Sequence, residues 1–431
     1  MHEVKLKIKY YNSLRLKSFP TAFKSADVIL LPKPGKDPLL AENYRPISLL
    51  SSIGKVLEKV VLIRLNEVVD EKAIIPDFQY GFRAAHSTTH QLLRVVEHIV
   101  NGFNNKKFTA LLSLDVSKAF DRVWHDGLLY KMISLDFPKP LVKLLSSYLS
   151  DRSFRVKLNG HLSTERPLDA GVPQGSLLSP LLFNIYCSDL PSPIDRNTHL
   201  AQYADDTAIL SSSANELLAI IRVQNQACLL ETWCRDWRVA INPSKSAATV
   251  FTRRKTKTHP NIMMFGEKVP WTSDIKYLGV TLDSKLTWKK HIDSKVNSAS
   301  NALSALYPMM CRNSKLSTDN KLLIYKAIVR PIMTYAAPVW GYAAKYHINK
   351  MQVVQNKALR ISLNAPRWIP VRILHKDTKI LRVSAFIKSL STKFYDSLAN
   401  HSNPTIKNLS EYDLNEPSKH NRPKSVLNRD D

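Results

Sequence analysis

Two adjacent carboxylates separate two short segments near the middle of the chain and limit what this region can form. Asp205 and Asp206 lie between residues 200–203 and 208–210, which are predominantly apolar. This pattern is typical of a β-hairpin with an acidic turn, and paired aspartates at a turn present several oxygen atoms to a hard divalent cation. Aspartate is also common in ordinary surface turns, because it tolerates turn geometry. The pair by itself therefore leaves both interpretations open.

A third carboxylate stands at the end of a predicted buried strand upstream. The short run FTALLSL at 108–114 has the character of such a strand, and Asp115 follows it directly. If this strand lies beside the hairpin, Asp115 and the Asp205–Asp206 pair could hold two Mg²⁺ ions about 3.5 to 4 Å apart. Two ions at that spacing activate an attacking oxygen and stabilise a leaving one. The three aspartates therefore predict a site for two-metal phosphoryl transfer.

A glycine-bounded loop lies between these two acidic segments. The run GVPQGSLLSP at 171–180 leads into a predicted helix, with Ser179 as the N-cap residue and Pro180 in the first turn. Glycines allow a backbone to approach a ligand closely. We therefore expect this loop to bring its backbone and the amide of Gln174 close to a nucleotide.

A series of segments matches the motifs of one enzyme family in their order along the chain. They are VILLPKPGK (28–36), NYRPISLL (43–50), GFRAAHS (81–87), LDVSKAFDRVWH (114–125), the 171–180 loop, YADD (203–206), INPSK (241–245) and YLGVTLD (277–283). The chain resembles the reverse transcriptase of a jockey-like non-LTR retrotransposon over nearly its whole length. The resemblance implies an RNA-directed DNA polymerase that adds dNTPs to a DNA primer on an RNA template.

The resemblance also implies roles for the acidic residues. Asp115, Asp205 and Asp206 would be the catalytic and metal-binding carboxylates, with Mg²⁺, or alternatively Mn²⁺, as the cofactor. Asp115 would bridge both ions, Asp205 would hold the ion that lowers the pKa of the primer 3′-hydroxyl, and Asp206 would support the metal cluster. The division between Asp205 and Asp206 stays open. The main-chain oxygen of Val116 would complete one coordination sphere.

Five residues match nucleotide-binding positions of the family, and four of them have an ordinary structural alternative. Phe120 would close the sugar pocket against a ribose 2′-hydroxyl, or it packs in the core. Arg45 and Lys33 would hold the triphosphate through a bidentate guanidinium and a mobile ammonium, and Lys245 would protonate pyrophosphate; each could instead be solvated surface. Gln174 completes this set, whereas Asp121 is expected to face protein rather than metal.

Composition agrees with a polyanionic partner. Lys and Arg number 62 against 36 Asp and Glu, giving a formal net charge of +26, which is the electrostatic footprint of a nucleic-acid-binding protein. No uninterrupted apolar window reaches the roughly 18 residues of a membrane span, and the N-terminus lacks a signal-peptide core. The four cysteines show neither zinc nor disulfide spacing. We therefore expect an intracellular protein without a membrane or disulfide-linked partner, and the resemblance implies action in the nucleus.

The predicted fold class is α+β, which the resemblance identifies as a right-hand polymerase with an antiparallel palm sheet and a helical thumb. The expected units are fingers with an N-terminal segment (1–107), palm (108–252), a basic loop with primer-contacting strands (253–290), thumb (291–365) and a basic C-terminal extension (366–431). Within the palm we expect helices at 126–135 and 140–149, a hairpin around 155–167 and a long helix at 215–239. The last 20 or so residues are expected to be disordered, because they are rich in Lys, Asn, Ser and Pro.

Three functions remain open from the sequence. An RNA-dependent RNA polymerase would share the carboxylates but avoid a bulky aromatic at Phe120. A catalytically silent nucleic-acid-binding relic of a mobile element would retain only fold and charge. The intact carboxylates favour an active RNA-directed DNA polymerase. We expect no endonuclease domain in this chain, because it begins shortly before the finger motifs.

Overall fold

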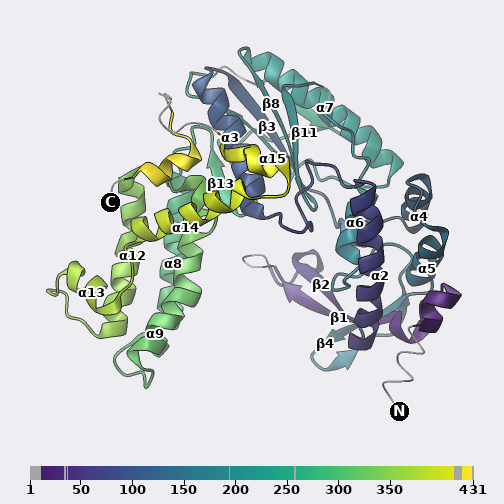
Figure 1. Cartoon of the computed structure of the whole chain (residues 1–431), viewed down its shortest axis with the longest axis horizontal. Helices are drawn as coiled ribbons and strands as arrows, with labels where there is room; N and C mark the ends of the chain where they lie inside the picture. Colours follow the sequence, from purple (N-terminus) through teal and green to yellow (C-terminus); the bar gives the residue numbers. More distant parts are fainter. Residues whose placement is uncertain are drawn as a thin grey trace.

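The computed structural model describes residues 11–33, 35, 37–193, 195–256, 259–411 and 420–429. The N-terminal elements and the C-terminal helices lie on opposite sides of the molecule, and a four-stranded sheet lies in the upper part of the view (Figure 1). Helices and strands are mixed along the chain, which confirms the α+β expectation.

The four-stranded sheet is antiparallel, with the strand order β7-β8-β3-β9. The predicted strand at 108–114 and the hairpin around Asp205 are both confirmed. The strands are β3 (Phe108–Leu114), β7 (Thr198–Tyr203), β8 (Asp206–Ser213) and β9 (Ala247–Phe251).

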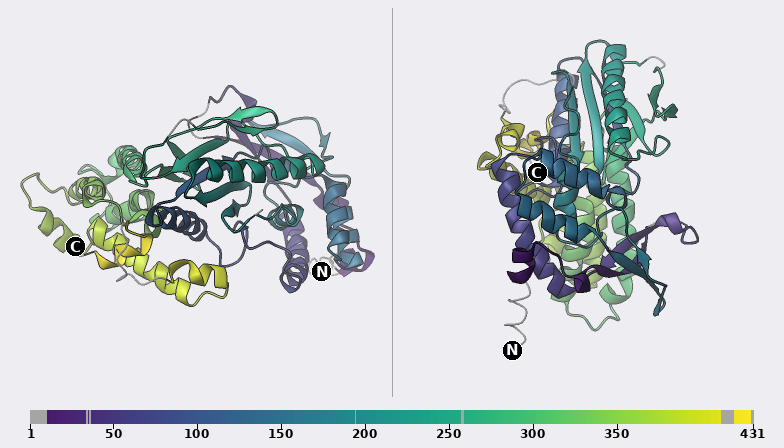
Figure 2. Two further views of the ribbon diagram at one scale, coloured as in Figure 1. Left: turned by 90° about the horizontal axis from the view of Figure 1, so that it is seen from above. Right: turned by 90° about the vertical axis from the view of Figure 1, so that its right-hand side faces the viewer.

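Helices cover both faces of this sheet, as the right-hand view of Figure 2 shows. Helix α3 (Thr88–Asn104) packs on one face, in the same core as Leu111. Helix α7 (Glu216–Asp236) packs on the other, in the same core as Leu112. Because successive strand residues point to opposite faces, β3 is buried on both sides, which explains its nearly continuous apolar sequence.

A second sheet has the order β2-β1-β4-β5, with β6 also paired to β4. Its strands are β1 (Ser25–Pro32), β2 (Tyr44–Leu49), β4 (Ser153–Leu158), β5 (His161–Leu162) and β6 (Arg166–Pro167). The hairpin expected at 155–167 in the palm unit instead extends this N-terminal sheet, because β4 pairs in parallel with β1. Parallel pairing joins distant segments without a hairpin turn, so it leaves no local sequence signal.

The helices expected in the first half of the chain are present. They are α4 (His125–Ser134), α5 (Lys139–Leu149) and α6 (Ser179–Tyr186). Helix α2 (Ser52–Glu71) precedes them, and short 3₁₀ turns lie at Thr21–Phe23, Ala41–Asn43 and Phe120–Arg122. The N-cap expectation for α6 is wrong by one residue, since Leu178 occupies that position. Ser179 is the first helical residue, and its hydroxyl donates to the carbonyl oxygen of Pro173 at 2.8 Å.

Two small hairpins follow the sheet. They are β10 (Ile262–Met264) with β11 (Glu267–Val269), and β12 (Asp274–Tyr277) with β13 (Val280–Asp283). Both hairpins lie within residues 253–290, where the sequence predicted strands after a basic loop. The basic loop before them is described only in part, because residues 257 and 258 lie outside the described residues.

The C-terminal helices form the side of the molecule drawn at the left of Figure 1. They are α8 (Lys289–Met310), α9 (Thr318–Ile324), a π-helical turn at Tyr325–Val329, α10 (Arg330–Thr334), α11 (Ala337–Trp340), α12 (Lys345–Leu363), α13 (Val371–Thr378), α14 (Val383–Ala399) and α15 (Pro404–Lys407). None of the described helices has the length and apolar character needed to cross a membrane.

Helices on the two sides of residue 365 pack against each other. Helix α14 packs against α11 and α12, and it buries Val383, Ile387 and Leu398 at helical spacing. The expectation of disorder is wrong for residues 420–429, where a 3₁₀ segment (Pro423–Asn428) buries Pro423 and Val426. Polar composition concealed these few regularly spaced apolar residues. Residues 412–419 and 430–431 lie outside the described residues.

Candidate active site

The acidic pair occupies the turn between β7 and β8. Tyr203 pairs with Asp206 across the hairpin, and Ala204 adopts the left-handed backbone conformation with φ of +57°. Asp205 lies in the turn and Asp206 is the first residue of β8. This tight turn presents adjacent carboxylates at one end of the sheet, as the sequence predicted.

Asp115 lies at the same end of the sheet. It follows the last residue of β3, and the pairing of Leu114 with Thr207 brings it beside Asp206 on the neighbouring strand. Because β3 pairs with β8, Asp115 lies at the same end of the sheet as Asp205 and Asp206, which are about 90 residues later in the chain. The structure confirms the expected arrangement of strand and hairpin.

The pKa values of the paired aspartates reflect their closeness to one another and to Asp115. Loss of hydration, followed by the charges of Asp205 and Asp115, raises the pKa of Asp206 to about 6. Loss of hydration and the charge of Asp115 also raise the pKa of Asp205, while its own backbone N–H and the charge of Arg45 oppose that rise. The carboxylates therefore repel one another in the protein alone.

The donor chemistry of these residues fits a hard divalent cation. Carboxylate oxygens are the ligands that Mg²⁺ prefers, and their mutual repulsion is relieved by a bound cation. Among the described residues, however, no group of three or more His, Cys, Asp or Glu side chains converges closely enough to hold a metal ion. The three carboxylates share an end of the sheet without closing on one point.

A turn after α7 fixes the backbone at Asp115. The N–H of Asn242 donates to the carbonyl oxygen of Asp115 at 2.8 Å, and the N–H of Asp115 donates to the hydroxyl of Ser246 at 3.1 Å. Val116 forms an isolated bridge with Ile241. Lys245 lies in this turn with an exposed side chain, and its N–H donates to Asn242 Oδ1 at 3.1 Å. Lys245 is thus joined to the Asp115 backbone through one turn.

The segment before α3, residues 79–81, forms hydrogen bonds with the backbone of the acidic turn. Gln79 is 1% exposed, and its Oε1 accepts hydrogen bonds from the N–H groups of Gly81 at 2.7 Å and Ala204 at 2.9 Å. A Cβ atom at Gly81 would overlap the backbone nitrogen of Ala204. Asn184 holds this segment by donating to the carbonyl oxygen of Gly81 at 2.9 Å.

Sequence reasoning missed the supporting roles of Gln79 and Asn184. The motif that begins at Gly81 was the available signal, because a glycine in such a motif indicates a close backbone approach. It did not indicate which backbone segment lay opposite.

Phe120 lies among aromatic rings beside the site. Its ring stacks on Phe183 with centroids 5.0 Å apart and meets Phe82 edge-on at 5.9 Å. The side chain is half-buried. Phe120 therefore packs against two other aromatic side chains, and its role beside a sugar stays a prediction.

Gln174 is held by the residue after Phe120. Its Nε2 donates to Asp121 Oδ1 at 2.8 Å, so Asp121 contacts the protein as expected. The carbonyl oxygen of Gln174 accepts a hydrogen bond from the N–H of Ser48 on β2 at 2.7 Å. Gly175 has φ of +131°, and a Cβ atom there would crowd the carbonyl oxygen of Ser48. The loop thus requires a glycine to reach β2.

The two basic residues that are expected to hold the triphosphate lie in the β1–β2 hairpin. Arg45 is exposed on β2, and its charge reaches Asp205. Lys33 follows β1, and its ammonium donates to the carbonyl oxygen of Glu42 at 2.9 Å. Arg45 is therefore associated electrostatically with the acidic turn, whereas Lys33 is bound within its own hairpin. The predicted Pro34–Gly35 turn lies partly outside the described residues.

Two curated proteins of Drosophila melanogaster are similar to this chain. The RNA-directed DNA polymerase from mobile element jockey is 38% identical over 397 residues, covering 91% of this chain and 43% of that protein. The probable RNA-directed DNA polymerase from transposon BS is 38% identical over 402 residues, covering 91% and 44%. This chain therefore spans less than half the length of these relatives.

A solved structure of apo telomerase from Candida tropicalis aligns with a TM-score of 0.41 at 11% identity, over 66% of this chain and 59% of that one. A similarity this weak supports no conclusion about this chain. The family model described as "Reverse transcriptase (RNA-dependent DNA polymerase)" matches residues 31–282, more than half of the chain. The chain therefore belongs to the reverse transcriptase family.

Proposed function

We propose that this chain is an RNA-directed DNA polymerase, the polymerase part of a non-LTR retrotransposon protein, and that it acts in the nucleus. The observation that carries the proposal is that Asp115, Asp205 and Asp206 all lie at one end of the four-stranded sheet. In this proposal the four-stranded sheet is the palm, the N-terminal sheet with α2 is the fingers, and the helices from α8 onward are the thumb.

The carboxylates would hold Mg²⁺, or Mn²⁺ in its place. Asp115, Asp205 and Asp206 would bind it together with the main-chain oxygen of Val116. When bound, a divalent cation lowers the pKa of the attacking hydroxyl and neutralises charge on the leaving oxygen. The protein itself contributes a rigid turn, because Gln79 and Gly81 fix the backbone at Ala204.

The incoming dNTP would lie between the acidic turn and the β2 side of the Gln174 loop. Arg45 supports this placement, because its charge already reaches Asp205. Its guanidinium would bind phosphate oxygens, with Lys33 as a second cation. Phe120 would exclude a ribose 2′-hydroxyl by contact, and Gln174 would face the nucleotide from the loop held by Asp121. Lys245 would donate a proton to the departing pyrophosphate.

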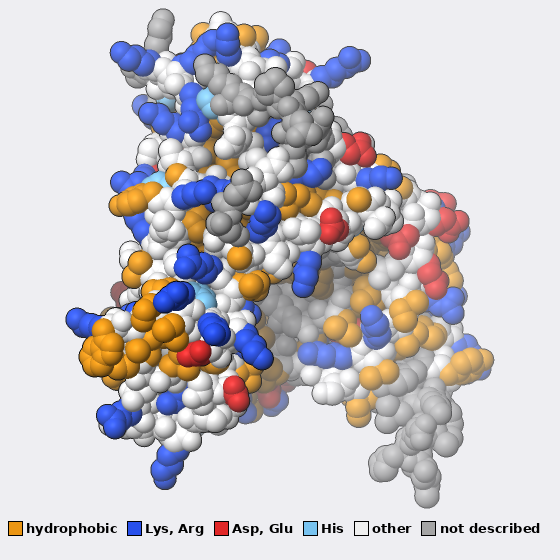
Figure 3. All heavy atoms as spheres, turned by 60° about the vertical axis from the view of Figure 1, so that its left-hand side comes forward, with side chains coloured by type: hydrophobic (Ala, Val, Ile, Leu, Met, Phe, Trp, Pro, Cys, Tyr) orange, Lys and Arg blue, Asp and Glu red, His pale blue; other side chains and the backbone are white. Residues whose placement is uncertain are grey.

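The template and primer would lie along the hollow between the two sides of the molecule. Figure 3 shows this hollow, with Lys and Arg side chains around it and over the C-terminal helices. The formal net charge of +26 supports binding of a polyanion. An RNA template and a DNA primer are the partners that the proposed reaction requires.

Primer extension tests this proposal. The purified chain is supplied with an RNA template, an annealed DNA primer, Mg²⁺ and either dNTPs or NTPs. The site variant is Asp205→Asn with Asp206→Asn, and the control is Asp236→Asn with Asp319→Asn, which removes the same charge from exposed helix positions. We expect extension with dNTPs, retained in the control and lost in the site variant.

Two outcomes would overturn the proposal. Extension with NTPs in preference to dNTPs would indicate an RNA polymerase. Absence of extension together with salt-sensitive RNA binding would indicate a nucleic-acid-binding protein without catalysis.

A further inference from the structure

A cavity of about 430 Å³ lies where the C-terminal helices meet the end of the sheet that is distant from the carboxylates. Arg253, which follows β9, is at that end, because Phe251 pairs with Thr109 near the start of β3. The length of β3 places this end about 20 Å from Asp115. The cavity is thus separate from the proposed active site. The lining residues used below are Phe103, Arg253, Trp288, Tyr342, His347 and Arg429.

Polar atoms with unused hydrogen-bonding capacity line this cavity. Trp288 is 1% exposed, and the hydroxyl of Tyr342 is the only hydrogen-bonding group that its side chain reaches in the described part of the chain. His347 Nδ1 has no hydrogen-bond partner among the described residues. A buried polar atom that lacks a partner costs about 1 to 3 kcal/mol, so His347 Nδ1 and the unused hydrogen-bonding capacity of the Tyr342 hydroxyl indicate room for a polar ligand.

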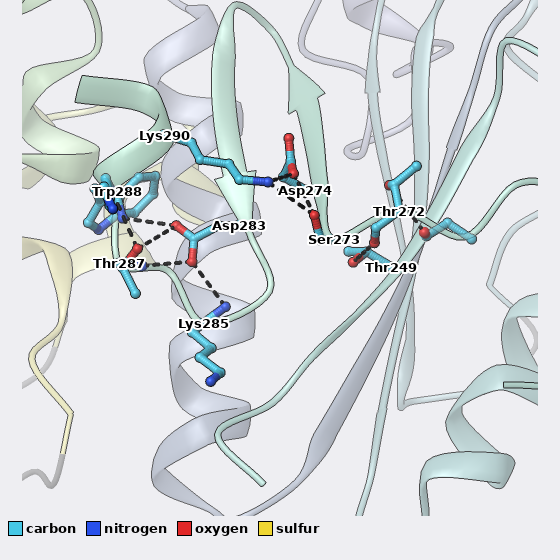
Figure 4. Close-up of polar contacts among 11 residues, drawn as sticks. Thr249, Thr272, Ser273, Asp274, Asp283, Lys285, Thr287, Trp288 and Lys290 are labelled. Carbon is cyan, nitrogen blue, oxygen red and sulfur yellow. Dashed lines mark hydrogen bonds and ion pairs between the residues drawn. The ribbon is translucent and has the colours of Figure 1, made fainter. Parts of the chain in front are cut away.

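The Trp288 side chain is presented by a tightly bonded loop, which Figure 4 shows. The carboxylate of Asp283 accepts hydrogen bonds from the N–H groups of Trp288 at 2.9 Å, Thr287 at 3.0 Å and Lys285 at 3.2 Å. Trp288 adopts the left-handed conformation with φ of +66° just before α8. The backbone that carries the Trp288 side chain is therefore fixed by contacts within the loop itself.

The charge of the cavity is positive. Arg253 and Arg429 line the cavity. No Asp or Glu is among the described residues that line it. The guanidinium of Arg253 lies 5.4 Å from the centroid of the Phe103 ring. Arg429 is fixed at the wall by donating to the carbonyl oxygens of Gly341 at 2.8 Å and Tyr342 at 2.9 Å. An anion with hydrogen-bond acceptors suits this lining.

The aromatic residues of the wall and the volume of the cavity limit the class of ligand further. Phe103, Trp288 and Tyr342 border the cavity beside the cations, with Phe103 and Trp288 almost fully buried in its wall. The volume exceeds that needed for phosphate alone. We propose that this cavity binds a single nucleotide, with its phosphate at Arg253 and its base against the aromatic rings. The nucleotide is either free or an unpaired residue of a nucleic-acid strand, since the recognition chemistry is the same.

The indole signal of Trp288 tests this site without reference to polymerase activity. The full chain, whose seven tryptophans are labelled with ¹⁵N, is titrated in EDTA with adenosine monophosphate, with adenosine, and with a short oligoadenylate. Trp288→Phe identifies the Trp288 indole signal. Tyr342→Phe, which removes one hydroxyl next to that indole, gives a second assignment if Trp288→Phe does not fold.

We expect a saturable shift of the Trp288 signal with the monophosphate or the oligonucleotide, and a weaker response to adenosine. Arg253→Gln should raise the Kd at least tenfold, since a hydrogen bond to a charged group is lost. Arg254→Gln is the matched control, because its side chain lies over Phe108 and does not line the cavity.

The response identifies the source of the nucleotide. A shift with the oligonucleotide alone assigns the site to a strand, and a shift with the monophosphate assigns it to the free nucleotide. No shift with either, or an equal Kd in Arg253→Gln, would overturn the site. Primer extension by Arg253→Gln reports separately on the proposed polymerase.

Discussion

The side-chain amide of Gln79 hydrogen-bonds both backbone groups of Ala204, the residue that begins the acidic turn. Oε1 accepts from the Ala204 N–H at 2.9 Å, and Nε2 donates to the Ala204 carbonyl oxygen at 3.3 Å. This contact joins segments 125 residues apart in the chain. The amide thus makes the two hydrogen bonds that a neighbouring strand would otherwise make with Ala204. It fixes the backbone just before Asp205.

Gln79→Leu should destabilise the protein and misplace the acidic turn. The substitution leaves the buried N–H groups of Gly81 and Ala204 unpaired, at a cost of about 2 to 4 kcal/mol in the free energy of unfolding. Urea unfolding measures that loss, and primer extension at a temperature where the variant is folded measures activity. Gln226→Leu, a buried glutamine on α7 away from the turn, should lose stability but keep activity. Equal activity in the two variants would refute the supporting role of Gln79.

Gly81→Ala should reduce extension strongly, because its methyl group would overlap the Ala204 nitrogen. The atoms that this methyl group would meet belong to the backbone of Tyr203 and Ala204, so no flexible side chain can move aside. Gly160→Ala is the comparison, since a Cβ atom there meets nothing within 4 Å although φ is +84°. The control should lose about 1 kcal/mol of stability with normal extension. Wild-type rates in Gly81→Ala would show that the turn tolerates displacement.

In the metal-free protein, protonation of Asp206 should contribute to the free energy of unfolding at low pH, and this contribution should decrease as the pH rises from about 4 to 6. The folded pKa of about 6 lies above the ordinary value of 3.8, so the folded state binds the proton more tightly than the unfolded state across this window. Stability from this group is full below that range and is lost as the pH passes the folded pKa. Asp206→Asn should remove this decline in urea unfolding measured in EDTA, whereas Asp236→Asn should retain it. Parallel pH profiles for wild type and Asp206→Asn would contradict the raised pKa.

Phe120→Val should relax selection against ribonucleotides. Removing the ring would open space beside a 2′-hydroxyl, and relief of one such contact changes discrimination about tenfold or more. The measurement is kcat/KM for NTPs relative to dNTPs. Phe120→Tyr preserves the bulk of the ring and should preserve selection. If Phe120→Val keeps the wild-type ratio, its stacking on Phe183 is purely structural.

Asp121→Ala should weaken dNTP binding without altering metal binding. Gln174 would lose the acceptor that fixes its amide at 2.8 Å, and loss of one such hydrogen bond raises the KM about five- to tenfold. Asp121→Asn retains an Oδ1 acceptor and should restore the KM. A fall in kcat that Mg²⁺ reverses would instead place Asp121 among the metal ligands.

Local patterns explain why much of the site was predictable. The apolar run before Asp115 became β3, and the two segments around Asp205 became β7 and β8. Side-chain alternation and turn chemistry operate over a few residues, so a short stretch of sequence contains them entirely. Helix α14 was not predicted, because its buried apolar residues are few and lie in a segment that is otherwise largely polar.

Local sequence patterns place the three carboxylates and the glycines at strand ends and turns. The pairing of β4 with β1, the contact of Gln79 with Ala204, and the shared cavity of Arg253 and Trp288 arise from the packing of the folded chain. These contacts join residues far apart along the chain. Their geometry depends on how whole elements pack, and no local sequence pattern encodes that packing.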